Sequence, residues 1–147
     1  MAEFILGMNA KIYYGTNTTD TLTDLTELSN VKDVTLNLEA GEADVTTRAN
    51  SGWRATAPTL RECTCEFEMV WKDSDAGFTA VKDAFLNATT LKLAVLTGDK
   101  DVANSEGPMG DFSITNFSRN EALEEAIMVS VTAKLAKFDQ WVKTTGT

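Results

Sequence analysis

Residues 125–138 read Glu-Ala-Ile-Met-Val-Ser-Val-Thr-Ala-Lys-Leu-Ala-Lys-Phe, and an apolar side chain falls on every second position from 127 to 135. Side chains of a β-strand point alternately to the two faces of its sheet, so this period of two predicts one long strand with one buried face. Long regular strands build architecture more often than active sites, and the stretch favours a structural role. The opposite face is small or polar and suits a surface lined by water or by another subunit: Met128, Ser130, Thr132, Lys134 and Ala136.

The same alternation recurs along the rest of the chain and predicts a mainly β fold. A helix is expected from Ser74 or Asp75 to about Asn87, because apolar residues there follow a helical period and the first residues can cap its start. Its apolar stripe belongs against a sheet. The glycine-containing acidic stretch 98–110 is expected to be a surface loop, and the acidic turn 121–125 is expected to close a hairpin. The expected strands are residues 11–14, 31–38, 60–71, 91–95, 112–117 and the final strand through residue 138.

Length and composition favour one globular domain over residues 1–147. The chain has 43% hydrophobic and 24% charged residues, which is ordinary for such a domain. Its formal charge of −9 disfavours a surface that grips nucleic acid through counterion release. It contains no histidine, the commonest general base and metal ligand in proteins. We therefore expect neither a cofactor nor a metal site.

Cys63 and Cys65 are the two cysteines, and they are two residues apart in a strand pattern. Their Cα atoms would lie roughly 6.5 to 7 Å apart, at or beyond the limit for a relaxed disulfide. Two thiolates without further ligands do not complete a tetrahedral zinc site. We expect buried thiols in a reducing compartment.

Residues 39–59 form the least regular stretch, with Gly41, Gly52, Pro58 and a threonine-rich centre. Loops of about 20 residues are uncommon in compact domains and are usually functional or disordered, and a tryptophan argues against disorder. Two interpretations stay open for the pair Trp53 and Arg54. Trp53 packs back onto its own core as a lid, or both residues make subunit contacts at the end of a docking arm, since interfaces favour these residue types.

The two ends of the chain are expected to lie outside the core. Residues 1–9 form an N-terminal arm whose apolar residues Phe4, Ile5 and Leu6 need a surface to pack on, and a neighbouring subunit is the expected one. Residues 139–147 are expected to form a C-terminal tail. The apolar run of the arm is too short for a signal-peptide core, so nothing here predicts export by the general secretory route or a membrane partner.

Residues 111–135, Asp-Phe-Ser-Ile-Thr-Asn-Phe-Ser-Arg-Asn-Glu-Ala-Leu-Glu-Glu-Ala-Ile-Met-Val-Ser-Val-Thr-Ala-Lys-Leu, resemble the closing hairpin of bacteriophage tail tube proteins. The order of an apolar arm, a strand pair broken by a long loop, a long strand ending near Trp71 and one helix with Phe78 and Phe85 is also similar to that family. The resemblance covers residues 2–138 and rests on pattern and order.

The resemblance implies a β-sandwich or barrel-like fold of antiparallel strands with one flanking helix and a long hairpin loop. It further implies a structural virion protein, assembled in the bacterial host's cytoplasm, whose hexameric rings stack into a hollow tail tube that conducts DNA without specific binding. Edge strands of the six subunits would pair into an inner barrel. The implied partners are other copies of the chain and the sheath, baseplate and tail terminator proteins. Type VI secretion systems and other contractile injection systems use similar inner-tube subunits, so that alternative stays open.

Two function classes compete with a tube subunit. Glu66 and Glu68 lie on one strand face, and paired carboxylates can hydrolyse glycosides, although such pairs on an exposed strand are usually just solvated. A monomeric β-sandwich that binds a sugar, with Trp53 as a stacking surface, is the stronger rival. Size in dilute solution separates this module, a monomer, from a tube subunit, which forms rings or fibres.

Overall fold

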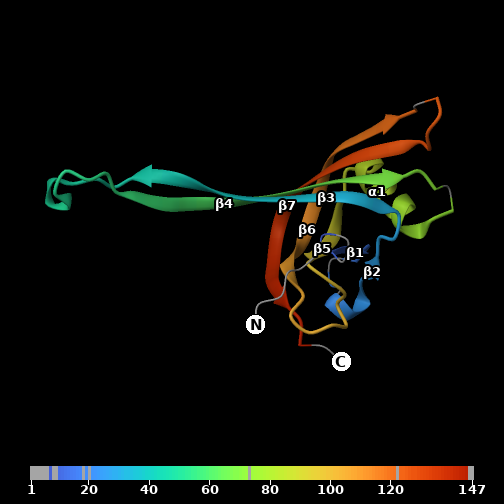
Figure 1. Cartoon of the computed structure of the whole chain (residues 1–147), viewed down its shortest axis with the longest axis horizontal. Coiled ribbons are helices and arrows are strands. Elements are labelled where there is room, and N and C mark those ends of the chain that lie inside the picture. Colours follow the sequence, from blue (N-terminus) through green and yellow to red (C-terminus); the bar gives the residue numbers. More distant parts are fainter. Residues whose placement is uncertain are drawn as a thin grey trace.

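The computed structural model describes residues 7, 10–17, 19, 21–72, 74–121 and 123–145. In this part of the chain all strands belong to one antiparallel sheet of seven strands in the order β2-β1-β5-β6-β7-β4-β3, with one helix against it (Figure 1). The expected mainly β fold with one flanking helix and a long hairpin is confirmed. The elements are β1 (Lys11–Gly15), η2 (Leu22–Asp24), β2 (Thr26–Glu27), β3 (Val31–Asp44), η3 (Arg48–Asn50), β4 (Thr56–Val70), α1 (Ala76–Leu86), β5 (Thr90–Leu96), β6 (Glu106–Asn120) and β7 (Met128–Lys143).

Helix α1 begins where the sequence predicts it, because the Asp75 carboxylate accepts a hydrogen bond from the Phe78 backbone N–H at 2.9 Å. Its apolar stripe covers one face of the sheet and buries Phe78, Val81 and Ala84. The Phe78 ring stacks on Phe117 of β6 at a centroid distance of 5.9 Å. These contacts form one side of the main core, whose other side consists of alternate residues of β4, β5, β6 and β7.

The two faces of β7 are assigned correctly by the alternation over residues 129–135. Val129, Val131 and Ala133 are fully buried, whereas Ser130 and Lys134 are exposed. The strand itself begins at Met128, so Ile127 lies before it and is 36% exposed. Cys63 and Cys65 are buried on the same side, as expected, and burial raises the pKa of the Cys65 thiol to about 12.

A second, smaller core packs against the other face of the lower half of the sheet, which consists of β1, β5, the start of β6 and the end of β7 (Figure 1). It consists of Tyr13, Leu25, Ala94, Leu96, Met109 and Val142. The adjacent strands β5, β6 and β7 also hold a charged cluster in this half, in which Lys92 and Asp111 are buried and Asp139 is partly exposed. Lys92 Nζ forms an ion pair with the Asp139 carboxylate and lies 3.6 Å from Asp111 Oδ1. The lower half is therefore packed on both faces.

Several expected boundaries are wrong. The strands extend into stretches whose residues pair with a neighbouring strand but do not alternate between apolar and polar side chains. The expected loop 39–59 is the far part of a β-hairpin: β3 continues to Asp44, β4 begins at Thr56, and only residues 45–55 form the connection. The expected tail 139–147 is wrong too, because β7 continues to Lys143 by pairing with β6. The acidic loop is shorter than expected, since β6 begins at Glu106.

Gly41 and Pro58 are strand residues for identifiable reasons. Thr59 and Leu60 together face Gly41 in a bulge, and a Cβ atom on Gly41 would lie 2.5 Å from Thr59 Oγ1. Pro58 pairs with Glu42 of β3 in a part of β4 that has no second partner strand among the described residues, and a missing N–H is tolerated at such an edge. Among the described helices, none is long and apolar enough to cross a membrane.

Candidate subunit interfaces

Four adjacent strand segments form a part of the sheet with a free edge on each side. They are residues 114–120 of β6, 128–134 of β7, 64–70 of β4 and 31–38 of β3, here called the four-strand face. Strand β5 pairs with β6 only as far as Ser113, and β3 pairs only with β4. In the part of the chain that the structure describes, the outer edges of β3 and of β6 beyond Ser113 thus have no partner strand. Unpaired edges are ready templates for pairing with another chain.

The exposed side of the four-strand face is polar across its whole width. In register, Thr35, Glu66, Thr132 and Asn116 form one row, and Glu68, Ser130 and Ser118 form the next. None of these side chains is buried, whereas the opposite side packs against α1. These two rows of the sheet therefore offer a polar and partly acidic surface between two free edges.

The β3–β4 hairpin leaves the body at a fork. Strand β4 pairs with β7 only up to Thr64 and Lys134, after which the two strands diverge (Figure 1). At ~3.3 Å per residue, the stretch from Thr56 to Cys63 alone extends roughly 23 Å beyond the fork. The far part of the hairpin does not contribute to the core of its own subunit. Its length suits contact with a second molecule.

The hairpin tip, residues 45–55, is held in a defined conformation by local hydrogen bonds. Asp44 Oδ1 accepts from the Thr46 N–H at 2.9 Å, and the hydrogen bonds from Thr46 lower the pKa of Asp44. The chain then turns through η3 and two residues with positive φ, Ser51 at 53° and Gly52 at 85°.

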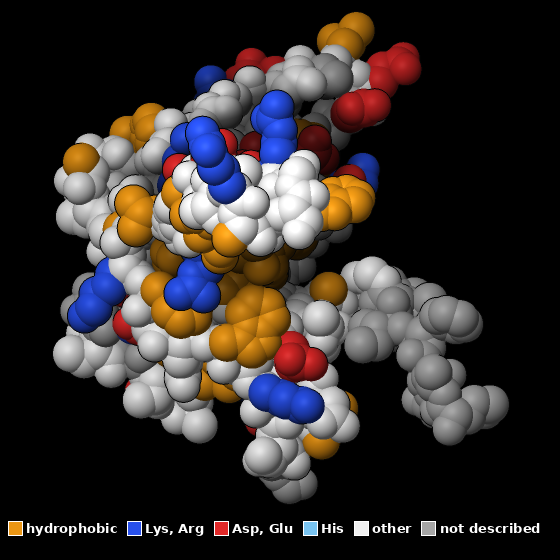
Figure 2. All heavy atoms as spheres, turned by 90° about the vertical axis from the view of Figure 1, so that its left-hand side faces the viewer, with side chains coloured by type: hydrophobic (Ala, Val, Ile, Leu, Met, Phe, Trp, Pro, Cys, Tyr) orange, Lys and Arg blue, Asp and Glu red, His pale blue; other side chains and the backbone are white. Residues whose placement is uncertain are grey.

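Trp53 and Arg54 follow this turn and point into solvent. Trp53 is 76% exposed and Arg54 is exposed as well. The interpretation of Trp53 as a lid on its own core is therefore wrong. The view from the hairpin end shows basic side chains on the part of the molecule nearest the viewer (Figure 2). The other expected contact residues, Phe4, Ile5 and Leu6, lie outside the described residues.

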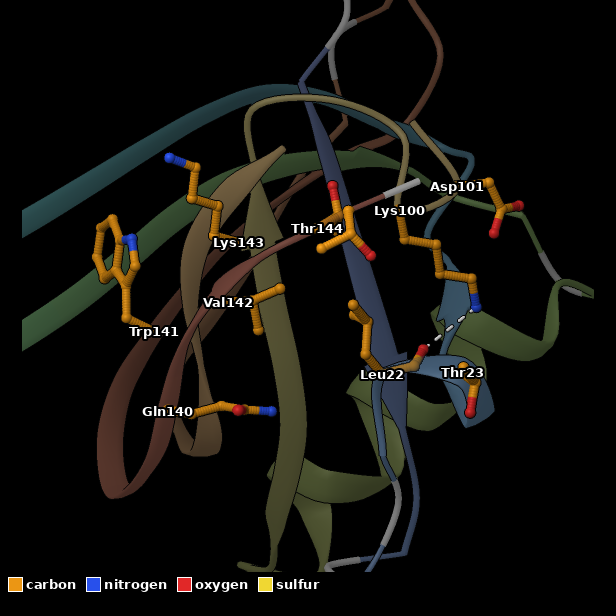
Figure 3. A pocket seen from close by; sticks show the side chains of 10 residues that line it. Leu22, Thr23, Lys100, Asp101, Gln140, Trp141, Val142, Lys143 and Thr144 are labelled. Atoms are coloured by element: carbon orange, nitrogen blue, oxygen red, sulfur yellow. Dashed lines mark hydrogen bonds between the residues drawn. The ribbon is translucent and has the colours of Figure 1, made fainter. Parts of the chain in front are cut away.

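A groove of about 530 Å³ lies between η2, the loop after β5 and the end of β7 (Figure 3). Of its two lysines, Lys100 has a structural role, because its Nζ donates to the backbone oxygens of Leu22 at 3.3 Å and Leu25 at 2.5 Å. The described residues contain no group of three or more His, Cys, Asp or Glu side chains placed to hold a metal ion. Glu66 and Glu68 lie on the open polar face rather than in this groove.

Sequence reasoning found the projecting tip, but it did not identify which strands have free edges, and it gave the acidic turn 121–125 only the role of a connection. Free edges depend on which strands pair, and a single chain carries no local signal for them. The turn between β6 and β7 holds Glu121, Glu124 and Glu125 together with Leu123, which is 99% exposed. A leucine among the glutamates of an expected surface turn was the signal that the sequence offered for a contact surface.

Solved structures with the same fold come from tail tubes and related particles. The tail of an empty gene transfer agent (GTA) particle with C6 symmetry matches with a TM-score of 0.73 at 18% identity, over 95% of this chain and 98% of that one. The SPP1 tail tube matches with 0.71 at 19% identity, over 96% and 79%. A subunit in the anti-feeding prophage baseplate matches with 0.61 at 5% identity, over 99% and 98%. These likenesses show the fold. No curated protein matches the sequence.

A family model described as "Phage tail tube protein" matches residues 9–137. This match covers both free edges, the hairpin and its tip, the helix and most of β7. The chain belongs to the phage tail tube protein family.

Proposed function

We propose that copies of this chain close into hexameric rings, which stack into the hollow tail tube through which DNA passes. The tail tube role follows from the family, and the number of six is carried over from the C6 symmetry of the GTA tail. The single observation that supports ring closure is the four-strand face with its two free edges. The outer edge of β3 in one subunit pairs with residues 114–120 of β6 in the next.

Ring closure would satisfy the backbone groups of both edges at once. Each subunit then contributes four strands to a continuous inner barrel, and closure removes an edge that would otherwise promote aggregation. Because α1 covers one side of the four strands, the polar side is the one that lines the lumen. Glu66 and Glu68 there repel phosphate, so DNA slides without binding.

The apolar arm and the hairpin tip are the proposed subunit contacts. Phe4, Ile5 and Leu6 pack on a neighbouring subunit, and Trp53 and Arg54 join one ring to the next. Deleting residues 2–9 should abolish assembly and leave a folded monomer. Loss of the cooperative thermal transition in the shortened chain would instead assign the arm to its own core.

The proposed further partners are the proteins that start, cover and end a tube, namely baseplate, sheath and tail terminator. We propose no enzymatic activity. The likeness to the anti-feeding prophage baseplate favours one second candidate, the inner tube of a contractile injection system. Both candidates predict rings and tubes of the purified chain.

Electron microscopy with analytical ultracentrifugation tests this function. The purified chain should form rings and tubes at high concentration. Monomers across all salt and protein concentrations, also after addition of preformed tail tip complexes as initiators, would contradict the proposal and favour the monomeric ligand-binding module.

A further inference from the structure

We propose that the basic hairpin tip of one subunit docks on the acidic β6–β7 turn of a second copy in the adjacent ring. This inference rests on the proposed tube and names the surface that receives the tip. The tip and the turn lie at opposite ends of the four-strand face, the tip at the left of Figure 1 and the turn at its upper right. When copies stack in one orientation along the direction of these strands, the tip of one copy meets the turn of the next.

The charges of the two ends are complementary. The tip carries Arg48 and Arg54 and no acidic residue between positions 45 and 55. The turn carries Glu121, Glu124 and Glu125. Within the described part of the chain, Glu121 alone of these three has a basic partner, Arg119, whose Nε lies 2.6 Å from Glu121 Oε1.

Glu124 and Glu125 make no ion pair with any residue that the structure describes, and the same holds for Arg48 and Arg54. Two cations and two anions are therefore available for contacts between copies. Such pairs steer association and fix the orientation of partners more than they add affinity.

Each end also exposes a large apolar side chain beside its charges. Trp53 is 76% exposed at the tip, and Leu123 is 99% exposed at the turn. An aromatic anchor next to arginine is the composition that contributes most to binding at interfaces. A contact between Trp53 and Leu123 would remove both surfaces from water.

The acidic segment from Asp99 to Glu106 is a poorer acceptor, because two of its three carboxylates, those of Asp99 and Glu106, already have partners. In the loop after β5 and at the start of β6, Asp99 lies 3.5 Å from Lys11 Nζ, and Glu106 Oε1 accepts from Trp141 Nε1 at 3.1 Å. A tip-to-turn contact is also head-to-tail. Contacts of that kind continue indefinitely along an axis, as tube growth requires.

Charge reversal tests the pairing. Arg48→Glu with Arg54→Glu should reduce mean tube length about tenfold at moderate salt, and Glu124→Arg with Glu125→Arg should do the same, because like charges then face each other. Combining all four changes should restore tubes. The matched control Asp83→Arg with Asp101→Arg alters exposed acids elsewhere and should leave the length unchanged.

Cross-linking gives a second readout that does not need long tubes. Ser51→Cys with Leu123→Cys should yield a ladder of multimers on a non-reducing gel, whereas Ser51→Cys with Asp101→Cys should not. The native thiols do not interfere, because Cys63 and Cys65 are buried. Tubes of unchanged length in the charge-reversed variants, or equal ladders from both cysteine pairs, would overturn this inference. Neither result would contradict the proposed tube. A parent chain that never assembles would refute the proposed function, and an absent Ser51–Leu123 ladder would refute the inference independently.

Discussion

Strands β5 and β3 belong to one sheet but differ in how far their side chains are buried. In β5, six of seven residues are buried, with a core on each face. In β3, none of the 14 residues is fully buried, and the hairpin it forms with β4 leaves the body after the fork. We infer from this difference that the β5–β7 body stabilises the subunit, whereas the hairpin extends away from the body and provides contact surface.

The hairpin can hold its shape because its register is specified within the hairpin itself. Eleven residue pairs join β3 and β4, and a bulge opposite Gly41 adjusts the path. A two-stranded hairpin is marginal alone in water, so the far part depends on its anchorage in the body and on a partner. Substitutions in the two regions should therefore affect different quantities.

The largest effect is expected in the body, at Val131. This side chain is 2% exposed, and Val131→Asp would bury an unpaired charge at a cost of several kcal/mol. The variant should not fold. Lys134→Ser, on the exposed side of the same strand, is the matched control and should keep the thermal transition of the parent. Equal losses from both changes, measured by circular dichroism melting, would show that the faces of β7 are misassigned.

A smaller loss is expected for the buried charge cluster. The Lys92 side chain is 3% exposed, and Lys92→Met would leave Asp111 and Asp139 without their cation, at a cost of roughly 3 kcal/mol. Adding Asp111→Asn and Asp139→Asn should recover most of that loss, because the remaining groups are neutral. Urea unfolding measures both steps. A single variant as stable as the parent would mean that the cluster contributes nothing to the body.

The smallest effect on the subunit is expected at the hairpin tip. Trp53→Ala with Arg54→Ala removes exposed side chains, so the free energy of unfolding should stay within about 0.5 kcal/mol of the parent. Electron microscopy should nevertheless show single rings or monomers instead of tubes, since the loss repeats at every subunit. A double variant that unfolds would make Trp53 part of the body, and one that forms tubes of ordinary length would make the tip dispensable.

The same contrast explains how much the sequence could predict. Alternation identified β7 from Val129 to Leu135 because one face there is buried. It failed between these two residues of the hairpin: Leu38 is 54% and Leu60 is 85% exposed, so from there outward no side faces a core, and Gly41 and Pro58 resemble loop residues. It also failed near the end of β7, where register shifts against β6 interrupt the period.

The interfaces were harder to predict than the fold. Residue type suggested Trp53 and Arg54, which indeed project into solvent. The free edges of β3 and β6 arise from pairings between strands far apart in the chain, and a local pattern holds no information about them. The acidic turn was read as a simple hairpin connection, because its role depends on what lies at the other end of the molecule.

The central claim is that the free edges of the four-strand face pair between subunits. A cryo-electron microscopy structure of tubes grown from the purified chain tests it most directly. We expect backbone hydrogen bonds between β3 of one subunit and residues 114–120 of β6 in the next, with Glu66 and Glu68 lining the lumen. Tubes in which these two edges stay unpaired, or in which the polar side of the four strands faces outward, would contradict the account.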